Sequence, residues 1–112
     1  MSQLTTHILD TSKGKPAEEI EVFLYQQHPA EWSEIAVGTT NKDGRIPDFL
    51  RKDVVLEPGI YKLRFETKAY FDKQAIQSFY PFIEIFFTIS GNEHYHVPLL
   101  LNPFGYSTYR GS

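Results

Sequence analysis

The sequence has no cysteine among its 112 residues. This absence excludes thiol catalysis, cysteine-ligated zinc and iron–sulfur chemistry. An excess of charge of one sign is also missing, because 14 acidic and 11 basic side chains leave a net charge of only −3. The basic residues are scattered and form no positive stripe that would follow a polyphosphate backbone, so we expect no nucleic-acid partner.

Long apolar runs are absent as well. The longest apolar-rich stretch, residues 79–89, is interrupted by Pro81 and Glu84 and is shorter than the roughly 20 residues that a membrane helix needs. Residues 1–10 lack the basic and apolar regions of a secretory signal. From the sequence we therefore expect no membrane partner, no export and a cytoplasmic location.

The apolar content that is present suffices for one hydrophobic core. Hydrophobic residues make up 41% of the chain, and a chain of this length buries roughly two thirds of its unfolded surface on folding. Two domains do not fit into this length, and no internal repeat or linker divides it. We therefore predict a single domain spanning residues 1–112.

Short runs of aromatic and β-branched residues, separated by Gly, Pro, Asn and Asp, predict a mostly β domain. In the clearest run, Ile20, Val22 and Leu24 alternate with more polar residues, which is typical of a strand with one face toward a core. We predict one short helix over residues 69–78 and strands over residues 4–10, 20–26, 32–40, 45–46, 60–67, 83–89, 94–101 and 106–110. This many short strands predicts a sandwich of two sheets.

Histidines are the first candidates for chemistry, because imidazole exchanges protons near neutral pH. His94 and His96 lie two residues apart in a predicted strand and so share a face, which suits either two ligands of one metal ion or a shared proton network. His7 lies in the first predicted strand, and His28 lies in a loop, where we expect it to be solvated. For each one the alternative is a histidine hydrogen-bonded to a backbone carbonyl at a sheet edge.

A metal site and a nucleotide site have little support in the sequence. The His94 and His96 pair supplies only two of the three ligands that catalytic zinc usually takes, although His7 makes a zinc-dependent hydrolase an alternative. Ser107 is not part of a Gly-x-Ser-x-Gly nucleophile elbow, and the phosphate-binding motifs Gly-x-Gly-x-x-Gly and Gly-x-x-x-x-Gly-Lys are absent. We expect no cofactor.

Two further polar groups are candidates for ligand binding. Arg45 follows an Asp-Gly turn, and its planar guanidinium suits an anionic or carbonyl-rich ligand, although a solvated side chain is the alternative. The segment containing Tyr109, Arg110 and Ser112 reads on composition alone as a frayed tail.

Taken as strings, four segments together resemble the transthyretin-related family of 5-hydroxyisourate hydrolases. They are Leu-Thr-Thr-His-Ile-Leu-Asp-Thr at 4–11, Thr-Asn-Lys-Asp-Gly-Arg at 40–45, Phe-Tyr-Pro at 79–81, and His-Tyr-His-Val-Pro-Leu-Leu-Leu at 94–101 with its continuation to residue 112. The final Tyr-Arg-Gly-Ser is the most specific, and the resemblance extends over essentially the whole chain. Residues 29–35 and 46–57 match only in general character.

The resemblance implies a transthyretin-like sandwich of two four-stranded sheets with one short helix, assembled as a homotetramer whose paired subunits form channels. It implies hydrolytic opening of the six-membered ring of 5-hydroxyisourate, a small-molecule substrate, during urate degradation. On this basis we expect His7 and His96 to activate water and shuttle protons, which leaves open which of them is the base. Arg45 is then expected to bind and polarise the ring carbonyls, and Tyr109 and Ser112 to orient the substrate.

A carrier of small molecules, like transthyretin itself, is the alternative from a different class. The resemblance implies that transthyretins lack the set of His7, Arg45 and His96 and do not end in Tyr-Arg-Gly-Ser. The presence of all these residues here favours the enzyme.

Overall fold

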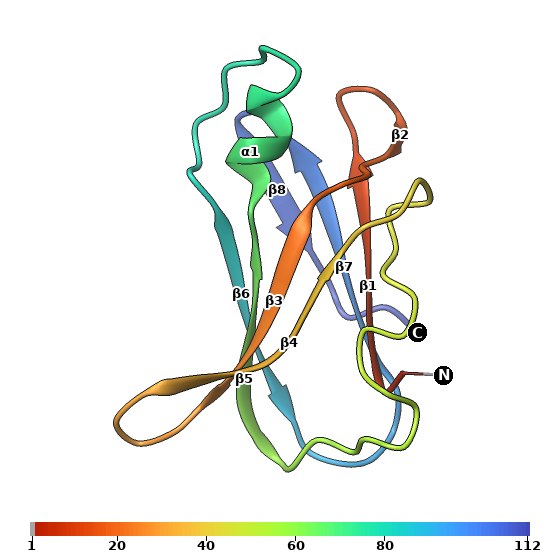
Figure 1. Ribbon diagram of the computed structural model, residues 1–112, viewed down its shortest axis with the longest axis vertical. Helices are drawn as coiled ribbons and strands as arrows, with labels where there is room; N and C mark the ends of the chain where they lie inside the picture. The colour runs from red at the N-terminus through yellow and green to blue at the C-terminus, as the bar shows by residue number, and fades with distance from the viewer. Residues whose placement is uncertain (1) are drawn as a thin grey trace.

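The computed structural model describes residues 2–112 and consists of two four-stranded β-sheets packed face to face (Figure 1). One sheet has the strand order β2-β1-β7-β8, formed by Lys15–Pro16, Leu4–Asp10, Tyr95–Asn102 and Gly105–Thr108. The other has the order β4-β3-β5-β6, formed by Trp32–Thr39, Glu21–Gln27, Gly59–Phe65 and Ile83–Ile89. The single short helix α1, Thr67–Asp72, connects β5 to β6. The predicted mostly β sandwich is confirmed.

The first sheet is mixed. β1 pairs in parallel with β7, and β7 pairs antiparallel with β8. In the parallel pair Thr5 lies opposite His96 and His7 lies opposite Pro98. This register brings together residues that are about ninety positions apart in the chain.

Alternation along the strands fills the space between the sheets. Val22 and Leu24 on β3 are fully buried, as are Leu63 and Phe65 on β5, while the residues between them face outward. The predicted inward faces of these strands are therefore confirmed. Burying a large apolar side chain contributes about 1.5–3 kcal/mol to folding.

A buried carboxylate joins the helix to the first sheet. Asp10 at the end of β1 is fully buried and accepts a hydrogen bond of 2.7 Å from the Tyr70 hydroxyl of α1. The backbone N–H of Ser12 donates a second one at 3.0 Å. No helix among residues 2–112 is long and apolar enough to cross a membrane.

Two predicted elements were wrong in their extent. The helix occupies Thr67–Asp72 instead of residues 69–78, because the chain turns at Ala75, which has a positive φ of 57°, and Ile76 packs against the core. The predicted strand at residues 45–46 is a single bridge between Arg45 and His7, because Pro47 has no N–H with which to extend the pairing.

The ends of the first sheet also differ from the prediction. The predicted turn after β1 contains the two-residue strand β2, Lys15–Pro16, which pairs with the end of β1. The last strand, β8, is Gly105–Thr108 instead of residues 106–110, and the chain beyond it returns to β7 through an isolated bridge between His96 and Gly111.

Candidate functional site

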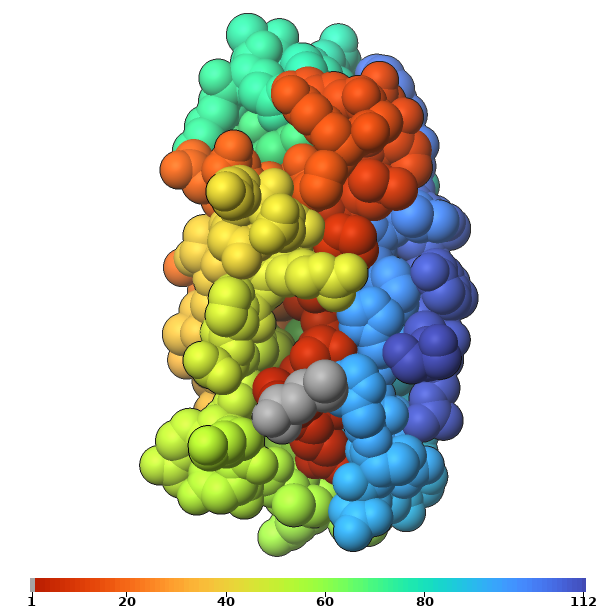
Figure 2. Space-filling view, turned by 90° about the vertical axis from the view of Figure 1, so that its right-hand side faces the viewer, coloured from red at the N-terminus to blue at the C-terminus, as the bar shows by residue number. Residues whose placement is uncertain are grey.

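The outer face of the first sheet carries the candidate residues. Thr5 and His7 on β1 and His96 on β7 are half-buried, whereas the residues that alternate with them point into the core. In Figure 2 β1 lies along the middle of this face, between the segment that follows β4 and the strand β7 with the last residues of the chain. His7 and His96, which are distant in sequence, thus reach one surface together with Thr5.

A tight turn brings Arg45 to this face. The Asn41 side-chain oxygen accepts hydrogen bonds from the backbone N–H groups of Asp43, at 2.9 Å, and of Arg45, at 3.1 Å. Gly44 has a φ of 73°, and a Cβ there would lie 2.4 Å from the backbone oxygen of Ile8, so the turn requires glycine. Arg45 then forms its bridge beside His7.

The last residues reach the same face from the other side. The N–H of Gly111 donates to the backbone oxygen of His96 at 2.8 Å. A Cβ on Gly111 would lie 2.6 Å from Cδ2 of the His96 ring, so only glycine allows this approach. The guanidinium of Arg110 lies over the Tyr95 ring, 4.4 Å from its centroid, and the chain then ends at Ser112 beside His96.

Together these elements form a shallow, open depression of about 280 Å³. The residues that line it are Thr5, Arg45, His94, His96 and Ser112. Arg45, His94 and Ser112 are exposed, so their side chains border the space that a ligand would occupy. The predicted residues Arg45, His96 and Ser112 thus share one site, and His7 adjoins it through its bridge to Arg45.

The electrostatics of the site favour neutral histidines. Burial lowers the pKa of His7 below its ordinary value of 6.5, and the positive charge of Arg45 lowers it further. The pKa of His96 is also lowered, by burial first and then by Arg45, His94 and His7. Both rings are therefore in the form that accepts a proton near neutral pH.

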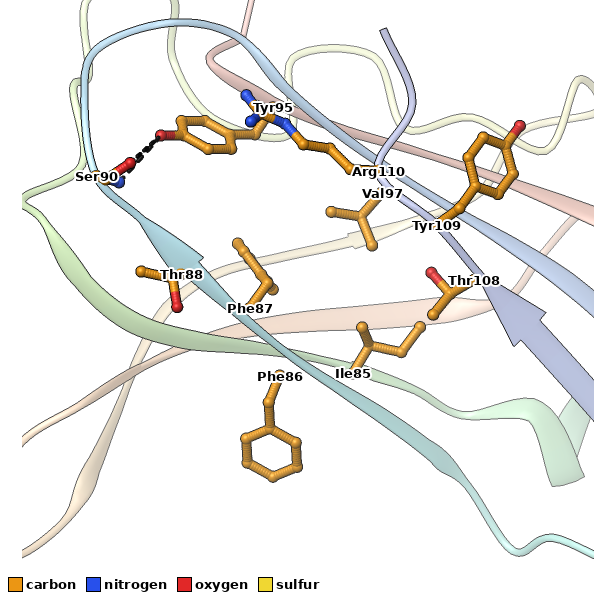
Figure 3. A pocket seen from close by; sticks show the side chains of 10 residues that line it. All are labelled: Ile85, Phe86, Phe87, Thr88, Ser90, Tyr95, Val97, Thr108, Tyr109 and Arg110. Carbon is orange, nitrogen blue, oxygen red and sulfur yellow. Dashed lines mark hydrogen bonds between the residues drawn. The ribbon is translucent and has the colours of Figure 1, made fainter.

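Tyr109 is not brought to this depression. It lines a different cavity of about 320 Å³, located between the edge strands β6 and β8. In Figure 3 its ring extends away from Ile85 and Phe86 of β6, and more than half of the residue is exposed. Within one chain Tyr109 is therefore separated from His96, and its expected role in orienting the substrate stays a prediction.

The remaining histidines are accounted for. His28 is exposed, as predicted, and its Nε2 lies 2.8 Å from the Ser33 hydroxyl. His94 shares the face of His96, also as predicted. Within residues 2–112 no three histidine or acidic side chains converge closely enough to hold a metal ion, so the zinc arrangement of His7, His94 and His96 has no geometric support.

Nearly the whole chain matches one family model. The model of the HIUase/Transthyretin family aligns with residues 4–111 and so includes every candidate residue except Ser112. The chain belongs to the HIUase/transthyretin family. The turn at Gly44 brings the string at 40–45 beside His7, and the approach at Gly111 brings the end of the last string beside His96.

The similar proteins include 5-hydroxyisourate hydrolases and a transthyretin. The chain is 47% identical over 110 residues to a 5-hydroxyisourate hydrolase of Salmonella typhimurium, with 97% of this chain and 80% of that relative aligned. Among solved structures it is similar to Klebsiella pneumoniae 5-hydroxyisourate hydrolase, with a TM-score of 0.85, 40% identity, and coverage of 97% and 98% of the two chains. It is also similar to sea bream transthyretin in complex with thyroxine, with a TM-score of 0.91, 33% identity, and coverage of 98% and 95%.

Sequence reasoning missed one residue of the site in this family member. Thr5 lies in the depression, and its Oγ1 contacts Nε2 of His94 and Nδ1 of His96, each at 2.8 Å. The alternation of β1 places Thr5 and His7 on one face, but only the parallel register with β7 sets Thr5 opposite His96.

Proposed function

We propose that this chain is a hydrolase that opens the six-membered ring of 5-hydroxyisourate. The product is 2-oxo-4-hydroxy-4-carboxy-5-ureidoimidazoline, on the route from urate to allantoin. The observation that carries the proposal is the convergence of His7, Arg45 and His96 on one surface from three separate segments. The name of the Salmonella relative, to which nearly half of the aligned residues are identical, supports the same substrate.

The residues present match what hydrolysis of a cyclic amide needs. Water attacks a ring carbonyl, the carbon–nitrogen bond breaks, the nitrogen takes a proton and the carbonyl carbon becomes a carboxylate. A neutral histidine, His7 or His96, takes the proton from water, and this proton is then returned to the leaving nitrogen, either by the imidazolium so formed or after transfer to the other ring. The guanidinium of Arg45 binds the ring carbonyls and stabilises the negative charge that develops on oxygen. The chemistry uses no cofactor.

We further propose that the enzyme is a cytoplasmic homotetramer. The depression at His96 is open and shallow, whereas enzymes bury most of a bound small molecule. A second copy packed on this face would enclose the depression and form a channel. Tyr109, with Ser112, orients the substrate in such an assembly if a neighbouring copy completes the site.

A carrier function is the second candidate, because the fold is also similar to that of the sea bream transthyretin, with a TM-score of 0.91. The polar surface formed by an arginine and two histidines favours the enzyme, since proton transfer needs these groups and retention of an apolar ligand does not.

Decay of freshly generated 5-hydroxyisourate, followed by ultraviolet absorbance, tests the proposal. We expect the protein to accelerate the decay far above the buffer rate, before and after exhaustive chelation. A rate equal to that of the buffer blank would reject the hydrolase, and binding of an aromatic hormone without turnover would favour the carrier.

A further inference from the structure

One hydroxyl group on β1 links the two histidines that flank Tyr95. The Oγ1 atom of Thr5 lies 2.8 Å from Nδ1 of His96 and 2.8 Å from Nε2 of His94. The two rings are nearly parallel, with 18° between their planes and 6.3 Å between their centroids. The three side chains therefore form a row of hydrogen bonds along the depression.

The single proton of the Thr5 hydroxyl couples the two rings. A hydroxyl donates one hydrogen bond, so when it donates to one histidine nitrogen the other nitrogen must donate to it. Both rings can donate together only if the hydroxyl proton finds a third acceptor. Among residues 2–112, Thr5 Oγ1 has no other hydrogen-bond partner. The hydrogen bonds of the row can therefore run in either of two directions, from His96 through Thr5 to His94 or the reverse. Each direction fixes a different tautomer of His96.

The direction decides whether His96 can act as a base. Because Nδ1 of His96 is occupied by Thr5, Nε2 is the nitrogen left to meet water or substrate. If Nδ1–H donates to Thr5 and Thr5 donates to Nε2 of His94, then Nε2 of His96 keeps a free lone pair. In the opposite direction Nε2 carries the hydrogen and is a donor only.

We propose that Thr5 and His94 are positioning residues that hold His96 in the tautomer protonated at Nδ1, which leaves Nε2 free to accept a proton from water. This assignment rests on the proposed hydrolase function, since it gives His96 the role of base. His94 is exposed and opens the end of the row to solvent. A proton gained by His94 would force its Nε2–H to donate to Thr5 and would reverse the row.

The charges around His96 agree with a neutral ring in this role. The groups that face it are His94, which immediately precedes β7, His7 on β1 and the guanidinium of Arg45 on the neighbouring turn. With burial, these groups hold the pKa of His96 below its ordinary value. What Thr5 and His94 add is the choice between the two neutral tautomers, which the surrounding charge does not make.

The tautomer is measured by ¹⁵N NMR of the full-length protein with labelled histidine, without substrate, at a pH where the histidines are neutral. We expect His96 to be protonated at Nδ1 in the wild type and to shift to the Nε2-protonated form in Thr5→Val, which keeps the branched shape but lacks the hydroxyl. An Nε2-protonated His96 in the wild type, or an unchanged tautomer in Thr5→Val, would overturn the proposal. This measurement reads no activity, so it decides the proposal even if the protein does not hydrolyse 5-hydroxyisourate.

Steady-state kinetics of Thr5 and His94 variants give a second readout. His94 is exposed, so we expect its replacement to leave the fold intact. We expect His94→Leu and Thr5→Val to lower kcat by about tenfold, less than the roughly hundredfold or more for removing a general base, with KM changed less than about threefold. His94→Gln, whose amide oxygen can accept the Thr5 proton, and Thr5→Ser should recover most of kcat.

His28→Leu is the matched control for these variants, because it removes another exposed histidine whose Nε2 contacts a hydroxyl at 2.8 Å. We expect it to leave kcat unchanged. Equal kcat for His94→Leu and wild type, or a change confined to KM, would overturn the proposal.

Discussion

His7 and His96 owe their protonation state to burial and to the guanidinium beside them. Burial is the larger cause that lowers the pKa of each ring, and the charge of Arg45 adds to it. A neutral imidazole can take a proton from water, whereas an imidazolium cannot. In the proposed reaction, the cation that binds the substrate therefore also keeps the neighbouring histidines in the basic form.

The substitutions His7→Asn, His96→Asn and Arg45→Lys test these roles with little change in volume. We expect each to leave a folded protein and to lower kcat/KM by about a hundredfold or more, because proton transfer or the planar two-pronged contact is lost. Ultraviolet assays on variants checked by circular dichroism measure this, and His28→Asn is the control. Losses below about threefold at all three positions would locate the site elsewhere.

The pH dependence follows from the same two rings. Since the pKa of each is lowered, we expect the acid limb of kcat/KM to lie below pH 6.5, with activity falling as the pH drops through the lowered values. Arg45→Gln removes a positive charge that lowers the pKa of both histidines. We therefore expect the variant to be less active and its acid limb to lie at higher pH than that of the wild type. A pH–rate profile that does not move, or moves to lower pH, would contradict the electrostatic argument.

At the scale of strands and turns, alternation in the sequence predicted faces but not partners. The inward residues of β3, β5 and β6 follow from period-two patterns, and these predictions are confirmed. The pairing of β1 with β7 depends on contacts between distant segments, which no local pattern encodes, and so the link from Thr5 to His94 was missed. The helix was misplaced because packing of Ile76 overrides the helix propensity of residues 73–77.

The sequence also predicted part of the candidate site. The segments that resemble the family contain His7, Arg45, His96 and Ser112, and these four residues are grouped in space. Tyr109 belongs to the same terminal string as Ser112, but the two residues line different cavities. Beyond the end of a strand, closeness in sequence therefore does not predict that two side chains point to the same cavity.

The close approach of the chain's last residues to β7 can be tested with one methyl group. Gly111→Ala places a Cβ 2.6 Å from Cδ2 of His96, so the ring or the segment must move. Because small misplacements of catalytic groups are costly, we expect kcat to fall by about tenfold to a hundredfold with little loss of stability. Gly105→Ala on β8 is the matched control, since its Cβ would make only ordinary contacts at 3.6 Å or more. Equal activity in the two variants would show that this approach does not position His96.

Across the whole molecule, the buried carboxylate of Asp10 connects the two sheets through α1. Burial alone would raise its pKa, but hydrogen bonds from Ser12, Tyr70 and the backbone of Lys13 bring it below the ordinary value of 3.8. The folded state therefore binds fewer protons at low pH than the unfolded chain. This stabilisation is present above about pH 3.8 and is lost as the pH falls below that value.

Asp10→Asn tests this connection. We expect the free energy of unfolding at neutral pH to fall by about 2 kcal/mol, because hydrogen bonds to a buried charged group are each worth about 1.5–3 kcal/mol and the amide keeps only part of them. Denaturant unfolding measures the loss, and the variant should lose less stability than the wild type below pH 3.8. Asp72→Asn, which breaks only an exposed ion pair with Lys68, should change stability by less than about 1 kcal/mol. Equal effects of the two substitutions would contradict the argument.

The proposed tetramer gives a reason for the aromatic surface beside β8. Phe79, Phe104 and Tyr106 are 70%, 64% and 43% exposed, and the Tyr106 ring packs edge-on against Tyr80 at 5.4 Å. A contiguous exposed apolar patch can mark a protein–protein interface, and we propose that role for these aromatic residues. A buried contact between copies here would hold the sites in a closed channel.

Tyr106→Glu places a charge in this aromatic surface without touching the depression at His96. We expect its tetramer, measured by light scattering, to dissociate at protein concentrations where the wild type stays assembled. Activity should fall in step with the tetramer fraction, while circular dichroism stays that of a folded β protein. Val37→Glu on β4 of the other sheet, where the valine is 48% exposed, controls for an added surface charge and should change neither property. Full activity in a dissociated Tyr106→Glu would mean that a single chain suffices for catalysis, and the open depression would then have to bind substrate without a neighbour.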